Sequence, residues 1–181
     1  NSDIAPVGIS VPASEHSVMA LRILRVLAKL KLDRAIATLD EKALRCKAEE
    51  VVIREFVTQD YPSGIISIVS DTFDFWNTIT NVARALKNEI LARTPNALGF
   101  AKVVFRPDSG DPVKILTGYK DSELVCGTDG KPTLVAGAYV ARESGVRVTE
   151  AERKGAVECL WDIFRGTVTD KGYKLLDSHV G

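Results

Sequence analysis

The sequence has few of the residues that carry metal-binding or redox motifs. Its 181 residues include 3 cysteines and 2 histidines. Cys46, Cys126 and Cys159 are far apart and form no C-x-x-C pair, which excludes a zinc ribbon and a thioredoxin-type redox pair. We therefore expect free thiols in a reducing compartment, with the cytoplasm as the default location, and we predict no metal site from these residues alone.

Long apolar runs and an excess of one charge are absent as well. The most apolar stretch, residues 18–32, is interrupted by Arg22, Arg25, Lys29 and Lys31, whereas a membrane span needs about 20 apolar residues. Lys and Arg number 24 and Asp and Glu number 24, so the formal net charge is zero. This balance argues against a partner that needs a strongly basic face, and we expect neither a nucleic acid nor a membrane as partner.

The composition is that of a globular protein. With 45% hydrophobic and 27% charged residues, we predict a single domain over residues 1–181. The dinucleotide, P-loop, nucleophile-elbow and zinc-protease motifs do not occur. Because the chain opens with Asn1 and its only methionine is Met19, we expect a processed product or a fragment.

Buried strands alternate with helices along the chain. The apolar runs 65–69 and 101–105 predict parallel strands, and residues 7–12 predict an extended segment before them. Helical spacing predicts four helices, which cover residues 14–31, 41–58, 75–90 and 113–119. A turn-rich stretch follows at 121–148. We expect it to hold a hairpin over 133–140 or an inserted loop.

The end of the chain follows the same logic. A capping box, Thr149 with Glu152, opens a helix that reaches Gly166, and a small hairpin follows over residues 167–176. Strands separated by helices imply parallel pairing through right-handed crossovers, so the predicted class is α/β. Two or three such units do not close a barrel, so we expect a small open sheet or a slice of a larger one.

Polar clusters follow three of the predicted strands, at the ends where parallel α/β folds bind ligands. The first contains Glu15 and His16, and the second contains Asp71, with Ser67 inside the strand before it. The third cluster is Arg106-Pro107-Asp108-Ser109-Gly110. We expect these side chains to converge.

The third cluster has the composition of an anion site. The planar fork of Arg106 suits a phosphate, Asp108 can accept hydrogen bonds from ribose hydroxyls, and Ser109 and Gly110 lead to a helix start with free N–H groups. The alternative is a structural turn in which Arg106 pairs with Asp108 or Asp111.

The histidine and aspartate also have two interpretations each. His16, beside Glu15, is either a structural surface residue or a general base or nucleophile toward phosphorus. Asp71 is either an active-site carboxylate or the cap of the next helix. His179 has no evident partner in the sequence.

Four segments resemble nicotinamide phosphoribosyltransferases, in the order that family has them. Residues 8–17 resemble the V-P-A-x-E-H-S segment, 68–74 the V-S-D-S/T-Y/F-D segment, 105–112 the R-P-D-S-G-[ND]-P loop, and 172–176 a further G-Y-K-L-L stretch. The turn-rich stretch and the helix after it are most similar to the bacterial and phage branch.

The resemblance implies a reaction and roles for particular residues. The family transfers phosphoribosyl from phosphoribosyl pyrophosphate to nicotinamide in NAD salvage, with Mg²⁺ and with ATP hydrolysis through a phosphorylated histidine. By motif, His16 matches that histidine, Glu15 would orient its imidazole, and Asp71 matches an active-site aspartate. The substrate-binding positions would be Arg106 for phosphate, Asp108 for ribose hydroxyls and Ser67 near the nicotinamide, together with Ser109 and Gly110.

The same resemblance implies an incomplete slice of the (β/α) barrel of type II phosphoribosyltransferases. The family's upstream base-sandwiching residues and downstream glycine-rich phosphate loop have no counterpart here, so we expect part of an active site without turnover in isolation, within a homodimer. Two alternatives stay open: a fragment of a nicotinate-using relative, and a non-catalytic phosphate-binding or dimerising α/β module.

Overall fold

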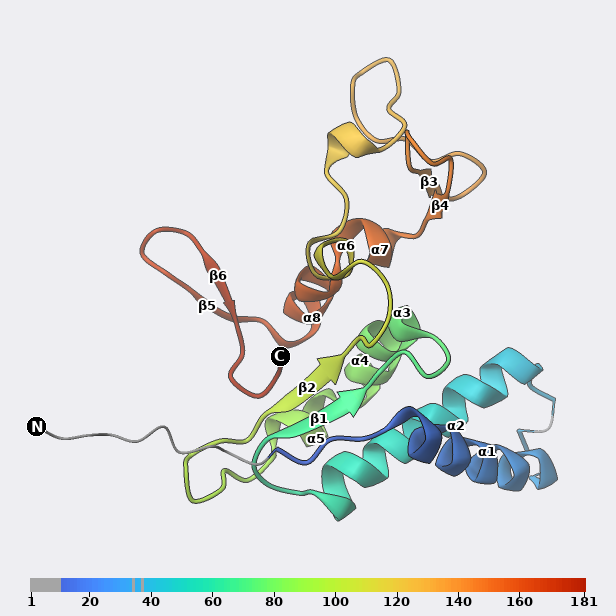
Figure 1. Ribbon diagram of the computed structural model, residues 1–181, viewed down its shortest axis with the longest axis vertical. Coiled ribbons are helices and arrows are strands. Elements are labelled where there is room, and N and C mark those ends of the chain that lie inside the picture. The colour runs from blue at the N-terminus through green and yellow to red at the C-terminus, as the bar shows by residue number, and fades with distance from the viewer. Residues whose placement is uncertain (1–10, 34, 37) are drawn as a thin grey trace, which may run out of the picture.

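Parallel strands form the centre of the structure, a computed structural model that describes residues 11–33, 35–36 and 38–181. Strand β1 (Ile66–Val69) pairs in parallel with β2 (Val103–Arg106), with Ile68 opposite Phe105 (Figure 1). Both strands were predicted from their apolar runs, and the α/β class is confirmed. Most of the extended segment predicted at residues 7–12 lies outside the described residues.

Two short segments extend this sheet on both sides. Residues 12–14 pair in parallel with β1, since Ser67 N–H donates to Pro12 O and Ser14 N–H donates to Ser67 O, each at 2.9 Å. On the other side, Val180 bridges Val103 in parallel. Four neighbouring strand positions therefore follow one another in chain order and direction, as expected of consecutive β/α units.

Helices connect these strand positions. The first crossover contains α1 (His16–Leu32), α2 (Glu41–Glu55) and the π-helix η1 (Phe56–Asp60). Asp40 caps α2 as its sequence suggests, because its carboxylate accepts the N–H of Ala43 at 2.7 Å. Figure 1 shows α1 beside α2, below the strand pair.

The second crossover was predicted as one helix and is divided into several short ones. They are α3 (Phe75–Asn77), the π-helix η2 (Thr78–Val82), α4 (Ala83–Ala85) and α5 (Lys87–Leu91). The predicted apolar face is nevertheless the buried one, because it depends on spacing rather than on an unbroken helix. The cap of this stretch is Asp74, whose side chain accepts the N–H of Asn77, so the interpretation of Asp71 as the cap is wrong.

The third crossover begins with α6 (Pro112–Thr117), with Pro112 at its first position as predicted. The 3-10 helix η3 (Asp121–Glu123) and the antiparallel strands β3 (Tyr139–Val140) and β4 (Arg147–Val148) follow in a lobe at the top of Figure 1. Within the predicted hairpin at 133–140, Val135 and Ala138 form an antiparallel bridge, and the ladder of β3 with β4 lies further along, over residues 139–148. Strands of two residues are too short for an alternating pattern to mark them.

The capping box of Thr149 and Glu152 is present, but the helix it opens is shorter than predicted. Helix α7 (Glu150–Lys154) ends at Gly155, whose φ is 80°, and α8 (Ala156–Phe164) continues in a new direction. The predicted hairpin is confirmed as β5 (Gly166–Val168) with β6 (Lys174–Leu176). No helix among the described residues is long and apolar enough to cross a membrane.

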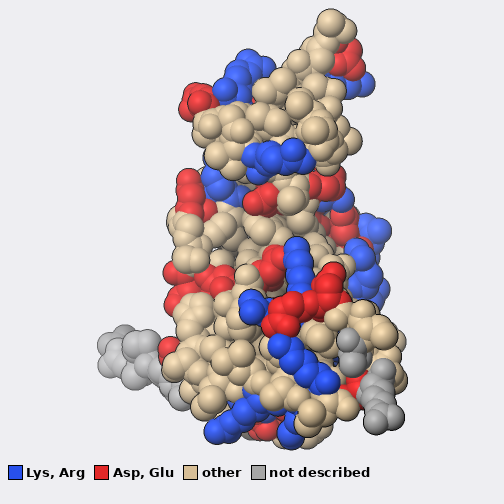
Figure 2. Space-filling view, turned by 90° about the vertical axis from the view of Figure 1, so that its right-hand side faces the viewer, with Lys and Arg blue, Asp and Glu red and all other residues tan. Residues whose placement is uncertain are grey.

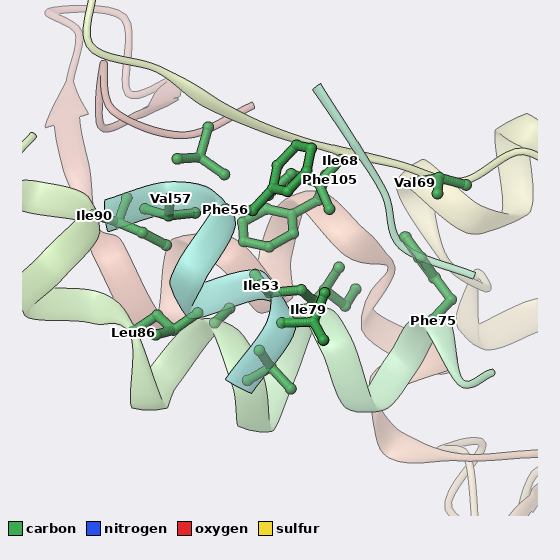
Figure 3. Packing of buried hydrophobic residues seen from close by; sticks show 14 of the residues in the cluster. Ile53, Phe56, Val57, Ile68, Val69, Phe75, Ile79, Leu86, Ile90 and Phe105 are labelled. Carbon is green, nitrogen blue, oxygen red and sulfur yellow. The ribbon is translucent and has the colours of Figure 1, made fainter. Parts of the chain in front are cut away.

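One main core lies between the sheet and these helices. Ile68 and Phe105 of the sheet pack over Ile53 and Phe56, and Ile79 of η2 lies beside them (Figure 3). On the face shown in Figure 2, basic and acidic side chains lie among one another, in keeping with the zero net charge. The core therefore fixes the strands and leaves their carboxyl ends free to carry polar groups.

Candidate active site

The three predicted polar clusters meet at the carboxyl ends of the strands. His16 begins α1 directly after residues 12–14, Asp71 follows β1, and Asp108 follows β2. The Nε2 atom of His16 lies 3.4 Å from Asp71 Oδ1 and 3.4 Å from Asp108 Oδ2. Residues far apart in the sequence thus share one site because parallel strands end at the same edge.

Arg106 lies beside this cluster and is held by three different groups. Its Nη2 donates to the carbonyl of Ser14 at 3.0 Å, its Nη1 donates to Ser67 Oγ at 3.4 Å, and its Nε lies 3.6 Å from Asp108 Oδ1. The alternative in which Arg106 pairs with Asp108 is thus partly realised. The Arg106 side chain as a whole is 31% exposed, which leaves it accessible to an anion.

Asp71 is fixed by the loop after β2. Its Oδ2 accepts the hydroxyl of Ser109 at 2.7 Å and the backbone N–H of Asp108 at 3.0 Å. Burial alone would raise the pKa of Asp71, but these two hydrogen bonds outweigh it and hold the pKa below its usual value. Asp71 is therefore an anion under ordinary conditions, and its buried Oδ1, which has no hydrogen-bond partner, faces His16.

Glu15 does not lie in this cluster. It lines a different cavity, of about 500 Å³, together with Arg22 of α1 and Phe56 and Asp60 of η1. The carboxylates beside the His16 ring are instead Asp71 and Asp108. The structure therefore places Asp71 and Asp108, rather than Glu15, beside the imidazole of His16.

The helix start after Gly110 is already capped. The Asp111 carboxylate accepts the N–H groups of Val113 at 2.9 Å and Lys114 at 3.4 Å. The expectation of free N–H groups at this helix start is therefore wrong. What the loop contributes instead is the Ser109 hydroxyl and a turn at Gly110, where φ is +96°.

Ser14 is part of the site and was missed by sequence reasoning. Its side chain is buried, its hydroxyl accepts the N–H of Val69 at 2.8 Å, and its carbonyl holds Arg106. Its place inside the motif at residues 8–17 was the available signal. Ser14 thus links the ends of residues 12–14, β1 and β2.

His179 has a partner after all. Its Nδ1 lies 2.8 Å from Asp177 Oδ1, and its carbonyl accepts the N–H of Val103 at 2.8 Å. It therefore stands at the outer strand position beside β2. The sequence interval of two residues did not reveal this pair, because the contact depends on the turn before the strand.

No group of three or more His, Cys, Asp or Glu side chains that could hold a metal ion occurs in the part of the chain that the structure describes. Magnesium often needs fewer protein ligands, because it takes one or two carboxylates and completes its shell with water and substrate phosphates. The unpartnered Oδ1 of Asp71 and the exposed carboxylate of Asp108 fit that pattern.

Parallel strands whose carboxyl ends gather a guanidinium, carboxylates and an imidazole are typical of α/β proteins that bind phosphorylated ligands. A model of the nicotinate phosphoribosyltransferase (NAPRTase) family matches residues 5–179. The chain belongs to this family.

Two bacterial relatives are each named nicotinamide phosphoribosyltransferase. The protein from Acinetobacter baylyi is 45% identical over 175 residues, which cover 97% of this chain and 26% of that protein. The protein from Mycoplasma pneumoniae is 26% identical over 125 residues, 68% of this chain and 21% of that protein. The chain thus spans about a quarter of the length of these curated relatives.

Proposed function

We propose that this chain supplies the histidine and phosphate-binding part of a nicotinamide phosphoribosyltransferase active site. The reaction would transfer phosphoribosyl from phosphoribosyl pyrophosphate to nicotinamide, forming nicotinamide mononucleotide and pyrophosphate. The observation that carries the proposal is the convergence of His16, Asp71 and Asp108 beside the Arg106 guanidinium. The names of both relatives support this substrate pair.

Each side chain has a role that its contacts support. Arg106, fixed by the Ser14 carbonyl and Ser67 hydroxyl, would bind a phosphate of the phosphoribosyl group in a set orientation. Asp108 is exposed enough to accept hydrogen bonds from ribose hydroxyls. Ser67 would lie toward the nicotinamide, and Ser109 and Gly110 would shape the loop around the phosphoribosyl group.

His16 would accept a phosphoryl group. With Nε2 directed at two carboxylates, the favoured neutral tautomer carries its proton on Nε2 and leaves a lone pair on Nδ1. Nδ1 would then attack the terminal phosphorus of ATP, forming an N–P bond while the bond to the bridging oxygen breaks and ADP leaves. Asp71 and Asp108 would stabilise the positive charge that develops on the ring.

Magnesium would be held by Asp71 and Asp108 together with oxygens of the substrate. When bound, the ion neutralises phosphate charge. The Oδ1 atom of Asp71 lies 3.4 Å from His16 Nε2 without a hydrogen bond, so it has a lone pair for the ion, which supports this assignment. The chain's own contribution is to keep Asp71 ionised, through the hydrogen bonds from Ser109 and the Asp108 N–H.

The substitution Arg106→Ala tests the site through binding. We expect it to weaken the affinity for phosphoribosyl pyrophosphate by about 10-fold or more in calorimetric titrations, because a charged hydrogen-bond donor contributes about 1.5–3 kcal/mol. Arg84→Ala, which removes an exposed arginine of α4, is the matched control and should leave the affinity unchanged. Equal affinities for Arg106→Ala and the parent chain would refute the phosphate site.

Nicotinate is the second candidate base, because the family model bears that name. Competition between nicotinamide and nicotinate, for binding to the chain loaded with phosphoribosyl pyrophosphate, separates the two. Preferential binding of nicotinate would overturn the choice of nicotinamide. Binding of phosphoribosyl pyrophosphate with neither base would favour the non-catalytic phosphate-binding module.

We further propose a cytoplasmic homodimer. Cys46, Cys126 and Cys159 are free thiols, which supports a reducing compartment. Residues 12–14 and 179–181 occupy the outer positions of the sheet, and exposed strand edges favour association. Light scattering after size exclusion should give a dimer mass, and a monomer at high concentration would contradict the dimer.

A further inference from the structure

A buried carboxyl group lies behind the loop that carries Asp71. Glu49 of α2 is 1% exposed, and its Oε1 has no hydrogen-bond partner. Burial raises the pKa of Glu49 to about 7; a hydrogen bond with Thr78 opposes this shift, and the nearby charge of Asp74 adds to it. A carboxyl in such surroundings favours its neutral form, because an unpaired buried charge is costly.

Two cations, Lys42 and Arg45, line the space beside Glu49, but no ion pair with the Glu49 carboxylate occurs in the described ranges. A cavity of about 510 Å³ separates α2 from residues 73 and 74 of the loop. Arg45 pairs through Nε with Glu41 at 3.3 Å and lies over the Phe73 ring. The full lining is Glu41, Lys42, Arg45, Cys46, Glu49, Phe73 and Asp74.

The other elements packed on α2 give Glu49 no counter-charge in the described ranges. Helix α1 buries Met19, Ile23 and Leu27, and the π-helix η2 contributes the buried Thr78. Asp74, at the end of the loop, has the same sign of charge as ionised Glu49. Protonation of Glu49 therefore removes a repulsion between α2 and the loop.

Thr78 connects Glu49 to the loop through a single hydroxyl proton. Its Oγ1 donates to the carbonyl of Asp74 at 3.2 Å, alongside its backbone N–H at 3.0 Å. A protonated Glu49 can donate to a lone pair of Thr78 Oγ1, so the Thr78 proton stays on Asp74. An ionised Glu49 can only accept, so the Thr78 proton must turn away from Asp74 to reach it.

Asp74 and Asp71 belong to the same short loop after β1. Asp74 closes it by capping α3 through Asn77, and Asp71 opens it with Oδ1 at 3.4 Å from His16. We propose that Glu49 is a positioning residue for Asp71, whose neutral form holds the loop in the geometry that brings Asp71 to His16. The role of Asp71 toward substrate rests on the proposed function, but its coupling to Glu49 does not.

The coupling is tested by amide NMR of the full chain between about pH 5.5 and 8.5. The spectra are recorded in a His16→Asn background, so that the imidazole beside Asp71 does not contribute to the response. We expect the amides of Asp71, Asp74 and Thr78 to shift with one midpoint near 7. Glu49→Gln, which imitates the neutral carboxyl, should abolish that midpoint.

The matched control is Glu50→Gln, one residue along α2. Glu50 pairs with Lys47 and Arg54, and this variant should keep the midpoint. A midpoint that survives in Glu49→Gln would overturn the proposal. So would a response confined to Asp74 and Thr78 that leaves Asp71 unmoved.

A binding measurement separates this proposal from the proposed function. In the chain with His16 intact, the affinity for phosphoribosyl pyrophosphate should fall roughly fivefold more between pH 6 and 8 than in Glu49→Gln, within the usual range of couplings between sites. Equal pH profiles despite measurable binding would overturn the positioning role. If neither protein binds while the amide response depends on Glu49, the proposed function fails and the positioning role stands.

Discussion

Arg93 is the buried group whose removal should cost the fold most clearly. Its side chain is 5% exposed, and its guanidinium donates to the carbonyls of Val57 at 2.5 Å, Tyr61 at 2.6 Å, Ser63 at 3.3 Å and Gly64 at 3.0 Å. Val57 lies in η1, and the other three carbonyls belong to the connection between η1 and β1. One side chain thus fastens this connection, alongside the backbone bridge of Ser63 with Thr94.

The magnitude follows from how deeply these hydrogen bonds lie. The bonds to Val57 and Gly64 are in the interior, and each should contribute about 1.5–3 kcal/mol because the donor is charged. The other two are partly solvated and contribute less. Removing the charge also recovers part of its desolvation free energy, so we expect Arg93→Met to lower the free energy of unfolding by about 3 kcal/mol.

Urea unfolding, monitored by circular dichroism, measures this loss in the free energy of unfolding. In thermal unfolding, the Tm should fall by roughly 6–12 °C for a chain of this size. Arg84→Met, on the exposed surface of α4, should change stability by less than about 0.5 kcal/mol. Arg93 contacts the chain just before β1, whereas the site lies at the other end of that strand. Affinity for phosphoribosyl pyrophosphate should therefore survive at a permissive temperature. A loss below about 1 kcal/mol would refute the reasoning.

Three further predictions concern backbone contacts and proton linkage. A Cβ at Gly155, where φ is +80°, would lie 2.4 Å from Gly118 N, so Gly155→Ala should lower the Tm strongly; Gly130→Ala, with φ +74° and open space, should cost much less. The pKa of Glu49 rises from 4.5 to about 7 on folding. The free energy of unfolding should therefore fall by about 3 kcal/mol as pH rises through that window. Measurements of stability against pH in Glu49→Gln should lack this loss. The lowered pKa of Asp71 has the opposite effect on the free energy of unfolding: its stabilisation is present above the unfolded pKa of 3.8 and is lost as pH falls below that value. In Asp71→Asn, acid titrations of stability should lack this loss.

The strands and helices that depend on local pattern could be predicted. The apolar runs located β1 and β2, and helical spacing identified the buried face that includes Ile79 and Leu86. Breaks within helices could not be predicted in the same way. The division at Gly155 is set by its contact with Gly118, which is distant in sequence.

The candidate site, too, could be predicted only in part. Strand ends predicted that His16, Asp71 and Arg106 converge, because parallel strands end at one edge. The sequence could not decide whether Glu15 or Asp108 lies beside the His16 imidazole, because that depends on how α1 packs. Glu49 was missed because a glutamate on a charged helix has no sign of burial in its local sequence.

The contact between Gly118 and Gly155 also bears on how the lobe above the sheet can vary. The chain leaves α6 at Gly118 and returns at Gly155, and Tyr119 N–H donates to Arg153 O at 3.0 Å where the two ends meet. Residues 120–152 thus begin and end at nearly one point, and they have their own small core of Leu124, Ala141 and Val148. A segment with adjoining ends can be shortened, exchanged or replaced by a tight turn while the strand ends that carry His16 and Arg106 keep their places. It is a natural insertion point for engineered domains.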